Sequence, residues 1–183
     1  MNIGWGLTEV AASRPDAIAV VEPAGRDASG SRQYRSVTFQ ALEDDSTRIA
    51  SGLHEYGVRP GMRLALLVKP GIDFVSLVFA LFKAGVVTIL IDPGMGRENL
   101  VRCLAEARPE GFVAIPLAHV ARILKRRKFP RARFNVTVGR RWFWGGRTLA
   151  QIRRSTAAIE PLMSNAEDPA AIIFTTGSTG PPK

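Results

Sequence analysis

Apolar residues in this chain fall into two kinds of segment that alternate along most of its length. The run 63–68 is almost continuously apolar, without the alternation of a strand that faces water on one side. Such a run is typical of a strand covered on both faces. The segment 38–56 instead places Leu42, Ile49 and Leu53 at helical spacing. Strands and helices are therefore expected to follow one another.

The same pattern gives a full set of expected elements. Thr38 has the side chain of an N-cap for the helix after it, and residues 22–33 have turn composition, so the first two strands are expected to pair as a hairpin. Strands are predicted at 18–21, 34–37, 63–68, 86–91, 111–115, 135–138 and, buried, 171–174; helices are predicted at 7–13, 39–56, 72–84, 97–107, 117–127 and 148–154. Strand–helix alternation at this spacing predicts an α/β fold, with a mainly parallel sheet and helices on both faces.

Composition narrows the class of protein. The 183 residues are about enough for one domain, and the single cysteine, Cys103, excludes an internal disulfide framework. We expect Cys103 in the core, and His54 and His119 as packing or surface residues, so no metal ligand is assigned. The first residues lack the basic-then-apolar pattern of a secretory signal, which favours a cytoplasmic protein.

The longest apolar stretch, 74–91, is almost long enough to span a bilayer. Lys83 lies in its middle, where a charge costs about 2.5–3.5 kcal/mol on membrane insertion, and Gly85 stands at a helix-stop position. A helix, a turn and a buried strand therefore explain the stretch better than a membrane span. Lys83 itself is interpreted as a cation that complements the helix C-terminus, without a chemical role.

The positive charge is concentrated in one segment. The net charge is +9, yet residues 111–159 hold 12 Lys and Arg and no acid, while the rest of the chain has 13 basic and 16 acidic residues. Residues 125–128 are all cations. This segment could be a solvated face, or it could meet anionic lipid, a phosphorylated ligand or nucleic acid. No sequence signature of a nucleic-acid-binding module is present.

The last nine residues carry the strongest chemical signal. Four hydroxyl side chains, two glycines and a lysine directly follow the final predicted strand. Glycine lets the backbone approach an anion closely, hydroxyls and backbone N–H groups donate to phosphate oxygens, and lysine adds a positive charge. The spacing fits neither the Walker A motif nor the dinucleotide fingerprint. The predicted phosphate-binding residues are Thr175, Thr176, Gly177, Ser178, Thr179, Gly180 and Lys183.

This nine-residue segment resembles the phosphate-binding signature of the adenylate-forming superfamily, which includes acyl-CoA synthetases, luciferases and peptide-synthetase adenylation domains. Segments 15–20, 37–42 and 81–93 resemble earlier parts of that family in the same order. Segments 90–94, 103–107 and 138–146 look most like the fatty-acid–CoA-ligase-like subgroup, which includes the β-lactone synthetases of bacterial olefin biosynthesis. The tryptophans of segment 138–146 are also explained by packing alone.

The resemblance implies a function for a longer parent protein. It implies ATP and Mg²⁺, activation of a long-chain fatty or 3-hydroxy fatty acid to an acyl-adenylate, and then transfer to CoA or β-lactone closure. Residues 1–183 would be the incomplete N-terminal part of an AMP-binding domain that ends at its phosphate-binding loop, and would be inactive alone. Catalytic residues are not assigned. Peripheral membrane contact through residues 122–154 would follow from their charge, and no nucleic acid is expected. The alternative is a basic module that binds membrane or nucleic acid without catalysis.

Overall fold

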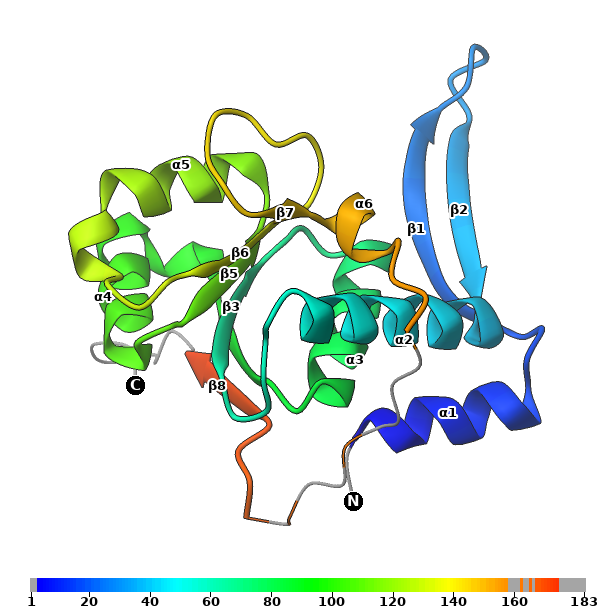
Figure 1. Cartoon of the computed structure of the whole chain (residues 1–183). Coiled ribbons are helices and arrows are strands. Elements are labelled where there is room, and N and C mark those ends of the chain that lie inside the picture. Colours follow the sequence, from blue (N-terminus) through cyan, green and yellow to red (C-terminus); the bar gives the residue numbers. More distant parts are fainter. Residues whose placement is uncertain (1–2, 158–161, 163–164, 166, 175–183) are drawn as a thin grey trace.

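The computed structural model describes residues 3–157, 162, 165 and 167–174, and in these the sheet is parallel, with strand order β7-β6-β5-β3-β4-β8 (Figure 1). A separate antiparallel hairpin, β1-β2, stands beside it. The strands are β1 Ile18–Arg26, β2 Arg32–Thr38, β3 Arg63–Leu67, β4 Val87–Ile91, β5 Gly111–Ala114, β6 Phe134–Thr137, β7 Arg147–Thr148 and β8 Ala171–Phe174. The helices are α1 Gly4–Ser13, α2 Phe39–Glu55, α3 Ile72–Lys83, α4 Arg97–Ala107, α5 Pro116–Leu124 and α6 Leu149–Ile152, with 3₁₀ turns at Pro93–Met95 and Arg126–Lys128. The predicted α/β class is confirmed.

Strand β3 lies in the middle of the sheet, hydrogen-bonded in parallel to β4 on one side and β5 on the other. Leu64 and Leu66 face one layer of helices and Ala65 faces the other, and all three are buried. A strand covered on both faces has no need for alternating polarity. The prediction that the strand at 63–68 is covered on both faces is confirmed.

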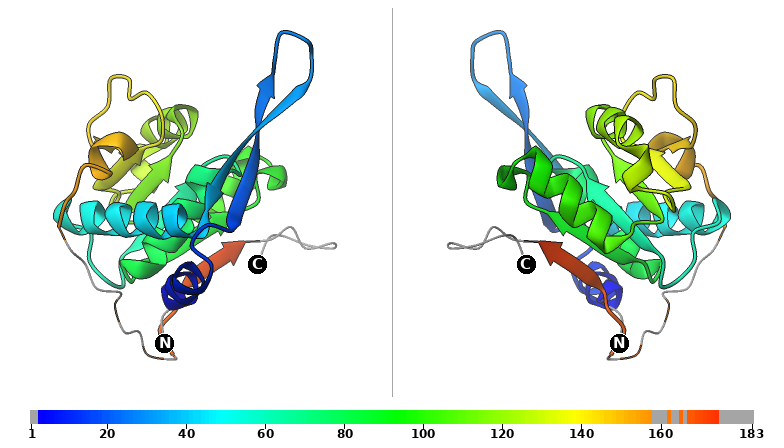
Figure 2. Two further views of the ribbon diagram at one scale, coloured as in Figure 1. Left: turned by 90° about the vertical axis from the view of Figure 1, so that its right-hand side faces the viewer. Right: turned by 90° about the vertical axis from the view of Figure 1, so that its left-hand side faces the viewer.

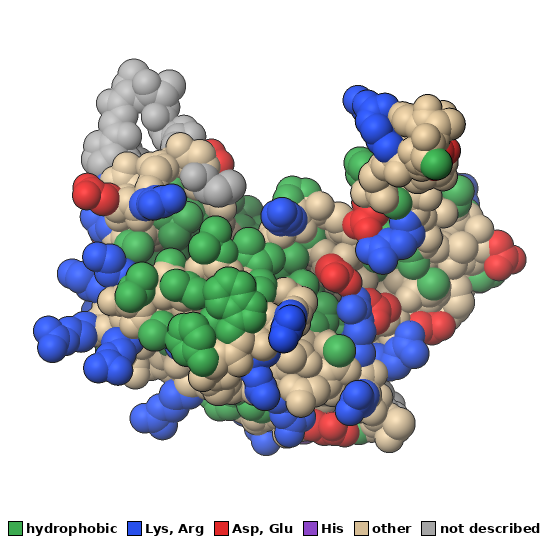
Figure 3. Space-filling model, turned by 90° about the horizontal axis from the view of Figure 1, so that it is seen from above, with side chains coloured by type: hydrophobic (Ala, Val, Ile, Leu, Met, Phe, Trp, Pro, Cys, Tyr) green, Lys and Arg blue, Asp and Glu red, His purple; other side chains and the backbone are tan. Residues whose placement is uncertain are grey.

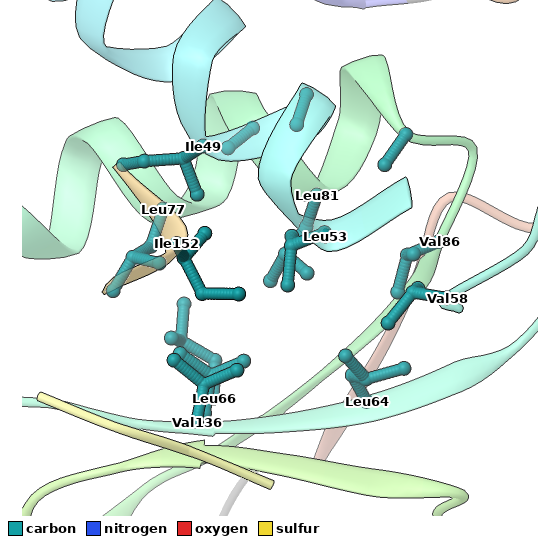
Figure 4. Packing of buried hydrophobic residues seen from close by; sticks show 14 of the residues in the cluster. Ile49, Leu53, Val58, Leu64, Leu66, Leu77, Leu81, Val86, Val136 and Ile152 are labelled. Carbon is teal, nitrogen blue, oxygen red and sulfur yellow. The ribbon is translucent and has the colours of Figure 1, made fainter. Parts of the chain in front are cut away.

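Two helical layers cover the sheet. Helices α2 and α3 lie on one face, where Ile49 and Leu53 of α2 meet Leu77 and Leu81 of α3 above the sheet (Figure 4). Helix α4 covers the other face, and Phe129 packs with it there. Thr38 caps α2 as predicted, because its hydroxyl accepts a hydrogen bond from Ala41 N at 3.2 Å.

The hairpin is longer than predicted. Its two strands pair from Ile18 opposite Thr38 to Arg26 opposite Arg32, so most of residues 22–33 is strand and the turn is confined to 27–31. The turn holds because the Asp27 carboxylate accepts hydrogen bonds from the backbone N–H groups of residues 29 and 31. The hairpin stands out from the sheet and helices in both side views (Figure 2).

Three further expectations need correction. Strand β8 forms as predicted but is not buried: it pairs with β4 at the edge of the described sheet, and Ile173 is 62 % exposed. The predicted helix 117–127 ends at Leu124, and the cations of 126–128 form a 3₁₀ turn after it. The helix predicted at 148–154 is reduced to Leu149–Ile152.

The apolar stretch 74–91 is a helix, a turn at Gly85 and strand β4, as expected. Gly85 has φ 67°, a conformation that favours glycine, and this lets the chain reverse between α3 and β4. Among the described residues, none of the helices is long and apolar enough to cross a membrane.

Candidate functional site

The predicted phosphate-binding residues lie outside the described part of the chain. These are Thr175, Thr176, Gly177, Ser178, Thr179, Gly180 and Lys183. The structure instead fixes the point at which the chain enters this segment. That point is Phe174, the last residue of β8.

Strand β8 delivers the segment to the carboxyl edge of the sheet. Phe174 is paired with Ile91, the last residue of the parallel strand β4. The backbone N–H of Asp92 donates to the carbonyl oxygen of Phe174 at a long 3.5 Å. In open α/β sheets, ligands bind outside the carboxyl ends of the strands. The predicted phosphate loop therefore starts at the edge where this class of fold binds its ligands.

The turn after β4 lies beside the end of β8, at which the predicted phosphate-binding segment begins. The Asp92 carboxylate accepts a hydrogen bond from Gly94 N at 2.8 Å and caps the 3₁₀ turn at residues 93–95. The chain then turns into α4 through Gly96, which has φ 82°. Asp92 thus holds the turn in shape. In the described ranges, no cluster of three or more His, Cys, Asp or Glu could hold a metal ion.

The strand order places a second feature on the same edge. After β3 the chain adds β4 on one side of it and then returns to add β5 on the other side. The direction in which strands are added to the sheet therefore reverses at β3. Such a switch point is a common ligand site. This switch point lies between β5 and β3, and is separated from β8 by β3 and β4. The carboxyl edge from β5 to β8 is therefore the candidate site, and Phe174, after which the predicted phosphate-binding segment begins, lies at one end of it.

The sequence reasoning missed a buried ion pair between α3 and α2, the two helices that cover one face of the sheet. Lys83, the last residue of α3, is only 1 % exposed, and its Nζ lies 2.7 Å from Glu43 Oε1 of α2. The same Nζ donates to the hydroxyls of Ser46 and Thr47 at 2.8 Å each. Thr8 of α1 donates to Glu43 Oε1 at 3.0 Å. Burial lowers the pKa of the Lys83 ammonium, and its pairing with Glu43 opposes that change.

Lys83 is therefore not simply a cation at a helix end. It joins α3 to α2, and Glu43 extends the connection to α1. The spacing of Glu43, Ser46 and Thr47 places them on one face of α2, because residues three and four apart on a helix share a face, but it does not identify Lys83 as their partner. A second connection joins α6 to the same layer, since Arg153 pairs with Asp45 and Asp73 at 2.7 Å each.

The structure also shows the surroundings of the single cysteine and the two histidines. Cys103 is buried, and burial raises the pKa of its thiol, which disfavours a nucleophilic thiolate. His54 is exposed. His119 is fully buried, with its Nε2 3.0 Å from the carbonyl oxygen of Val136, and burial lowers its pKa to about 4. The prediction of core or surface roles for these three residues is confirmed.

Two surface hollows lie along α4 and beside the residues that precede β5 and β6. A shallow cavity of about 650 Å³ is lined mainly by α4, together with Arg108 and Lys128, and a neighbouring one has about 360 Å³. The smaller cavity lies beside residues 108 and 127–131, which precede β5 and β6, whereas the larger one extends along α4 from Glu98 to Glu106. Neither cavity is lined by Phe174, after which the predicted phosphate-binding segment begins.

Comparison with known proteins decides the family. The sequence model of the AMP-binding enzyme family matches residues 7–183. The chain belongs to the AMP-binding enzyme family. The resemblance of its last nine residues and its upstream segments to adenylate-forming enzymes is thereby confirmed.

Comparison of this AMP-binding chain with individual proteins agrees with its family membership. It is 47 % identical over 186 residues to an olefin β-lactone synthetase of Stenotrophomonas maltophilia, and the match covers all of the chain and 34 % of that protein. It is 28 % identical to a long-chain-fatty-acid–CoA ligase (FadD13) of Mycobacterium tuberculosis, again over the whole chain and 34 % of the relative. A crystal structure of a long-chain-fatty-acid–CoA ligase from Archaeoglobus fulgidus, 22 % identical, has a TM-score of 0.83, covers all of this chain and is itself covered to 36 %. The chain spans about a third of the length of these proteins.

Proposed function

We propose that this chain is the front part of an AMP-binding domain, residues 1–183, in an enzyme that activates a carboxylic acid with ATP. One observation carries the proposal: the segment 175–183, with the residues of a phosphate-binding signature, follows a parallel strand at the carboxyl edge of the sheet. Membership of the AMP-binding enzyme family supports it.

The reaction proceeds in two steps. A carboxylate oxygen of the acid attacks the α-phosphorus of ATP, the bond to the bridging oxygen breaks, and pyrophosphate leaves. In the second step a nucleophile attacks the acyl carbon of the mixed anhydride, AMP leaves, and the proton of the nucleophile passes to a base or solvent. The adenylate makes the second step feasible because AMP is a far better leaving group than hydroxide.

The residues after β8 fit the first step by their chemistry. The hydroxyls of Thr175, Thr176, Ser178 and Thr179 donate to phosphate oxygens, and Lys183 offsets charge on the departing pyrophosphate. Gly177 and Gly180 let the backbone approach the phosphates. Mg²⁺ would neutralise phosphate charge when bound, but the described residues offer it no ligand cluster, so none is assigned.

We infer a long-chain fatty or 3-hydroxy fatty acid as the substrate. The support comes from the relatives, which include olefin β-lactone synthetases and long-chain-fatty-acid–CoA ligases. The second nucleophile is then either the thiol of CoA or the β-hydroxyl of the acid itself, which closes a β-lactone. The higher identity to the β-lactone synthetases favours the β-hydroxyl.

A reducing, cytoplasmic setting belongs to the same proposal, and the single, buried Cys103 is consistent with it. Peripheral membrane contact through residues 122–154 is also retained as a proposal. The rival function, a basic module without catalysis, does not explain the phosphate-binding signature. Nucleic acid is not proposed as a partner.

Pyrophosphate exchange into ATP tests the proposal in the full gene product that carries this chain. We expect exchange that depends on a long-chain acid and falls at least tenfold in Lys183→Ala. Arg32→Ala, which removes an exposed cation of the hairpin, is the control and should keep full exchange. Exchange that needs no acid would refute the proposed activity, and unchanged exchange in Lys183→Ala would refute the role of that residue.

A further inference from the structure

Helix α5 is apolar on the side that faces away from the protein. Leu117 is 70 % exposed and Leu124 is 77 % exposed, and these positions are seven apart, so they lie on one side of the helix together with exposed Ala121. The opposite side carries His119, which is fully buried against β6. A surface helix is normally polar on its outer side. The outer side of α5 therefore has the character of an interaction surface.

The loop between β6 and β7 adds two aromatic side chains. Trp142 is 54 % exposed and Phe143 is 77 % exposed. Only Trp144 fulfils the prediction that the tryptophans of this segment pack inside: it is buried, and its Nε1 donates to Thr137 Oγ1 at 2.9 Å. The ring centroids of Trp142 and Phe143 lie 5.6 and 5.2 Å from that of Trp144.

Trp144 also joins the loop to α5. Its ring centroid is 5.5 Å from the ring of His119, and Arg141 donates to the carbonyl oxygen of Gly146 across the base of the loop. The loop and α5 lie next to each other at the top of Figure 1. Seen from above, hydrophobic side chains gather in one area with Lys and Arg around it (Figure 3). We call this surface the aromatic patch; it comprises Leu117, Ala121, Leu124, Trp142 and Phe143.

The charged side chains in the segment that forms the aromatic patch are all cations. Exposed Lys125, Arg126 and Arg127 follow α5 directly, and exposed Arg140 precedes the aromatic residues. No acid occurs anywhere in residues 111–159. These cations are therefore not neutralised by acids of their own segment. A partner for this surface must combine negative charge with an apolar phase.

We propose that the aromatic patch docks on an anionic lipid bilayer, with Trp142 and Phe143 inserted at the level of the headgroups. Aromatic side chains favour the membrane interface, and nearby Lys and Arg are attracted to anionic headgroups. The proposal goes beyond acid activation and does not depend on it. It also defines the membrane contact proposed for the basic segment 122–154 more closely: apolar side chains enter the membrane and cations lie at its surface.

Two other occupants are less well matched to the patch. Nucleic acid would satisfy the cations but leave Leu117 and Leu124 without an apolar partner. The rest of a longer chain would start after β8, whereas the patch is formed by the connections into and out of β6, four strands away. At the usual spacing of strands this is roughly 19 Å along the sheet.

Vesicle sedimentation of the full gene product tests the proposal, without ATP or acid so that failure of the proposed catalysis cannot affect it. We expect binding to vesicles of phosphatidylglycerol and phosphatidylcholine, weaker binding to phosphatidylcholine alone, and weakening by salt. The Trp142→Ser/Phe143→Ser variant should bind at least about tenfold more weakly, because it loses most of the inserted apolar area. Arg126→Gln/Arg127→Gln should lose about fivefold per cation at low salt.

Matched controls come from the hairpin, at a distance from the patch. Tyr34→Ser and Arg32→Gln change an exposed aromatic residue and an exposed cation there, and both should bind vesicles like the unmodified protein. All these side chains are exposed, so circular dichroism should be unchanged in every variant. Equal vesicle binding by Trp142→Ser/Phe143→Ser, or no vesicle binding at all, would overturn the proposal.

Tryptophan fluorescence and competition by RNA distinguish a lipid bilayer from the other partners that could cover the aromatic patch. Lipids brominated near the headgroup should quench the unmodified protein more than Trp142→Phe, because Trp142 would lie within reach of bromine. Before vesicles are added, acrylamide should also quench Trp142. Shielding from acrylamide would show that the rest of the chain or a second copy covers the patch, and this too would refute the proposal. Displacement of bound vesicles by RNA at low concentration would refute it in favour of nucleic acid.

Discussion

Replacing Lys83 with methionine tests the buried ion pair between α2 and α3. The side chain keeps much of its volume, but the carboxylate of Glu43 loses a cation 2.7 Å away. The hydroxyls of Thr8 and Thr47 can still donate to Glu43 Oε1, while Glu43 Oε2 is buried and already lacks a hydrogen-bond partner among the described residues. Removing one partner of a buried pair costs about 3–5 kcal/mol, since it leaves an uncompensated charge.

We therefore expect Lys83→Met to lower the free energy of unfolding by about 3–5 kcal/mol. Replacing both partners removes the stranded charge, so Lys83→Met/Glu43→Leu should recover at least about 2 kcal/mol of that loss. Lys69→Met, at an exposed position after β3, is the matched control and should change stability by less than about 0.5 kcal/mol.

Urea unfolding followed by circular dichroism and by tryptophan fluorescence gives these values, provided that the two signals change together. A loss below about 1 kcal/mol in Lys83→Met would show that the charge of Glu43 is solvated or neutralised without its partner. A double variant no more stable than Lys83→Met would show that lost packing, and not a stranded carboxylate, causes the effect.

Substitutions at one histidine and two glycines also test the account of the fold. In the folded protein the pKa of His119, about 4, lies below its ordinary value of 6.5, so the unfolded chain binds the proton at a higher pH than the folded one. The contribution of neutral His119 to the free energy of unfolding should therefore be fully present above pH 6.5, and that free energy should fall by about 3 kcal/mol as the pH drops to 4. His119→Gln should flatten this slope in urea midpoints between pH 7 and 4.5, and an unchanged slope would assign it to other groups. Gly52→Ala should cost about 2 kcal/mol or more, because its Cβ would lie 2.1 Å from the backbone oxygen of Ile152. Gly6→Ala, in an open helical position, should instead raise the melting temperature slightly, and equal effects at the two glycines would contradict the packing of α6 on α2.

Elements with a strong local signal were predictable from the sequence. Helix α4 has the predicted bounds because Gly96 precedes it and residues 100, 103 and 104 place their side chains on one face. Strand β3 could be predicted to be covered on both faces, since its apolar run shows no polar face. The hairpin was predicted too short, because its strands are mostly exposed and have the polar composition that local rules associate with turns.

Features that depend on distant partners were not predictable. The exposure of β8 follows from its place beside β4 at the edge of the described sheet, which apolar composition alone does not reveal. Lys83 could not be paired with Glu43 from their spacing, since 40 residues separate them. The candidate site shows the same division: phosphate binding by residues 175–183 is a prediction from their sequence, whereas the point at which the chain leaves the sheet before them emerges only from the pairing of β8 with β4.

Mass spectrometry of the reaction products tests the central claim most directly. The full gene product is mixed with ATP, Mg²⁺ and a long-chain fatty or 3-hydroxy fatty acid, without CoA. The account predicts pyrophosphate together with the acyl-adenylate, or with AMP and a β-lactone from the hydroxy acid, and none of these products when the acid is omitted. Release of ADP and phosphate, or unaltered ATP with every acid offered, would contradict it.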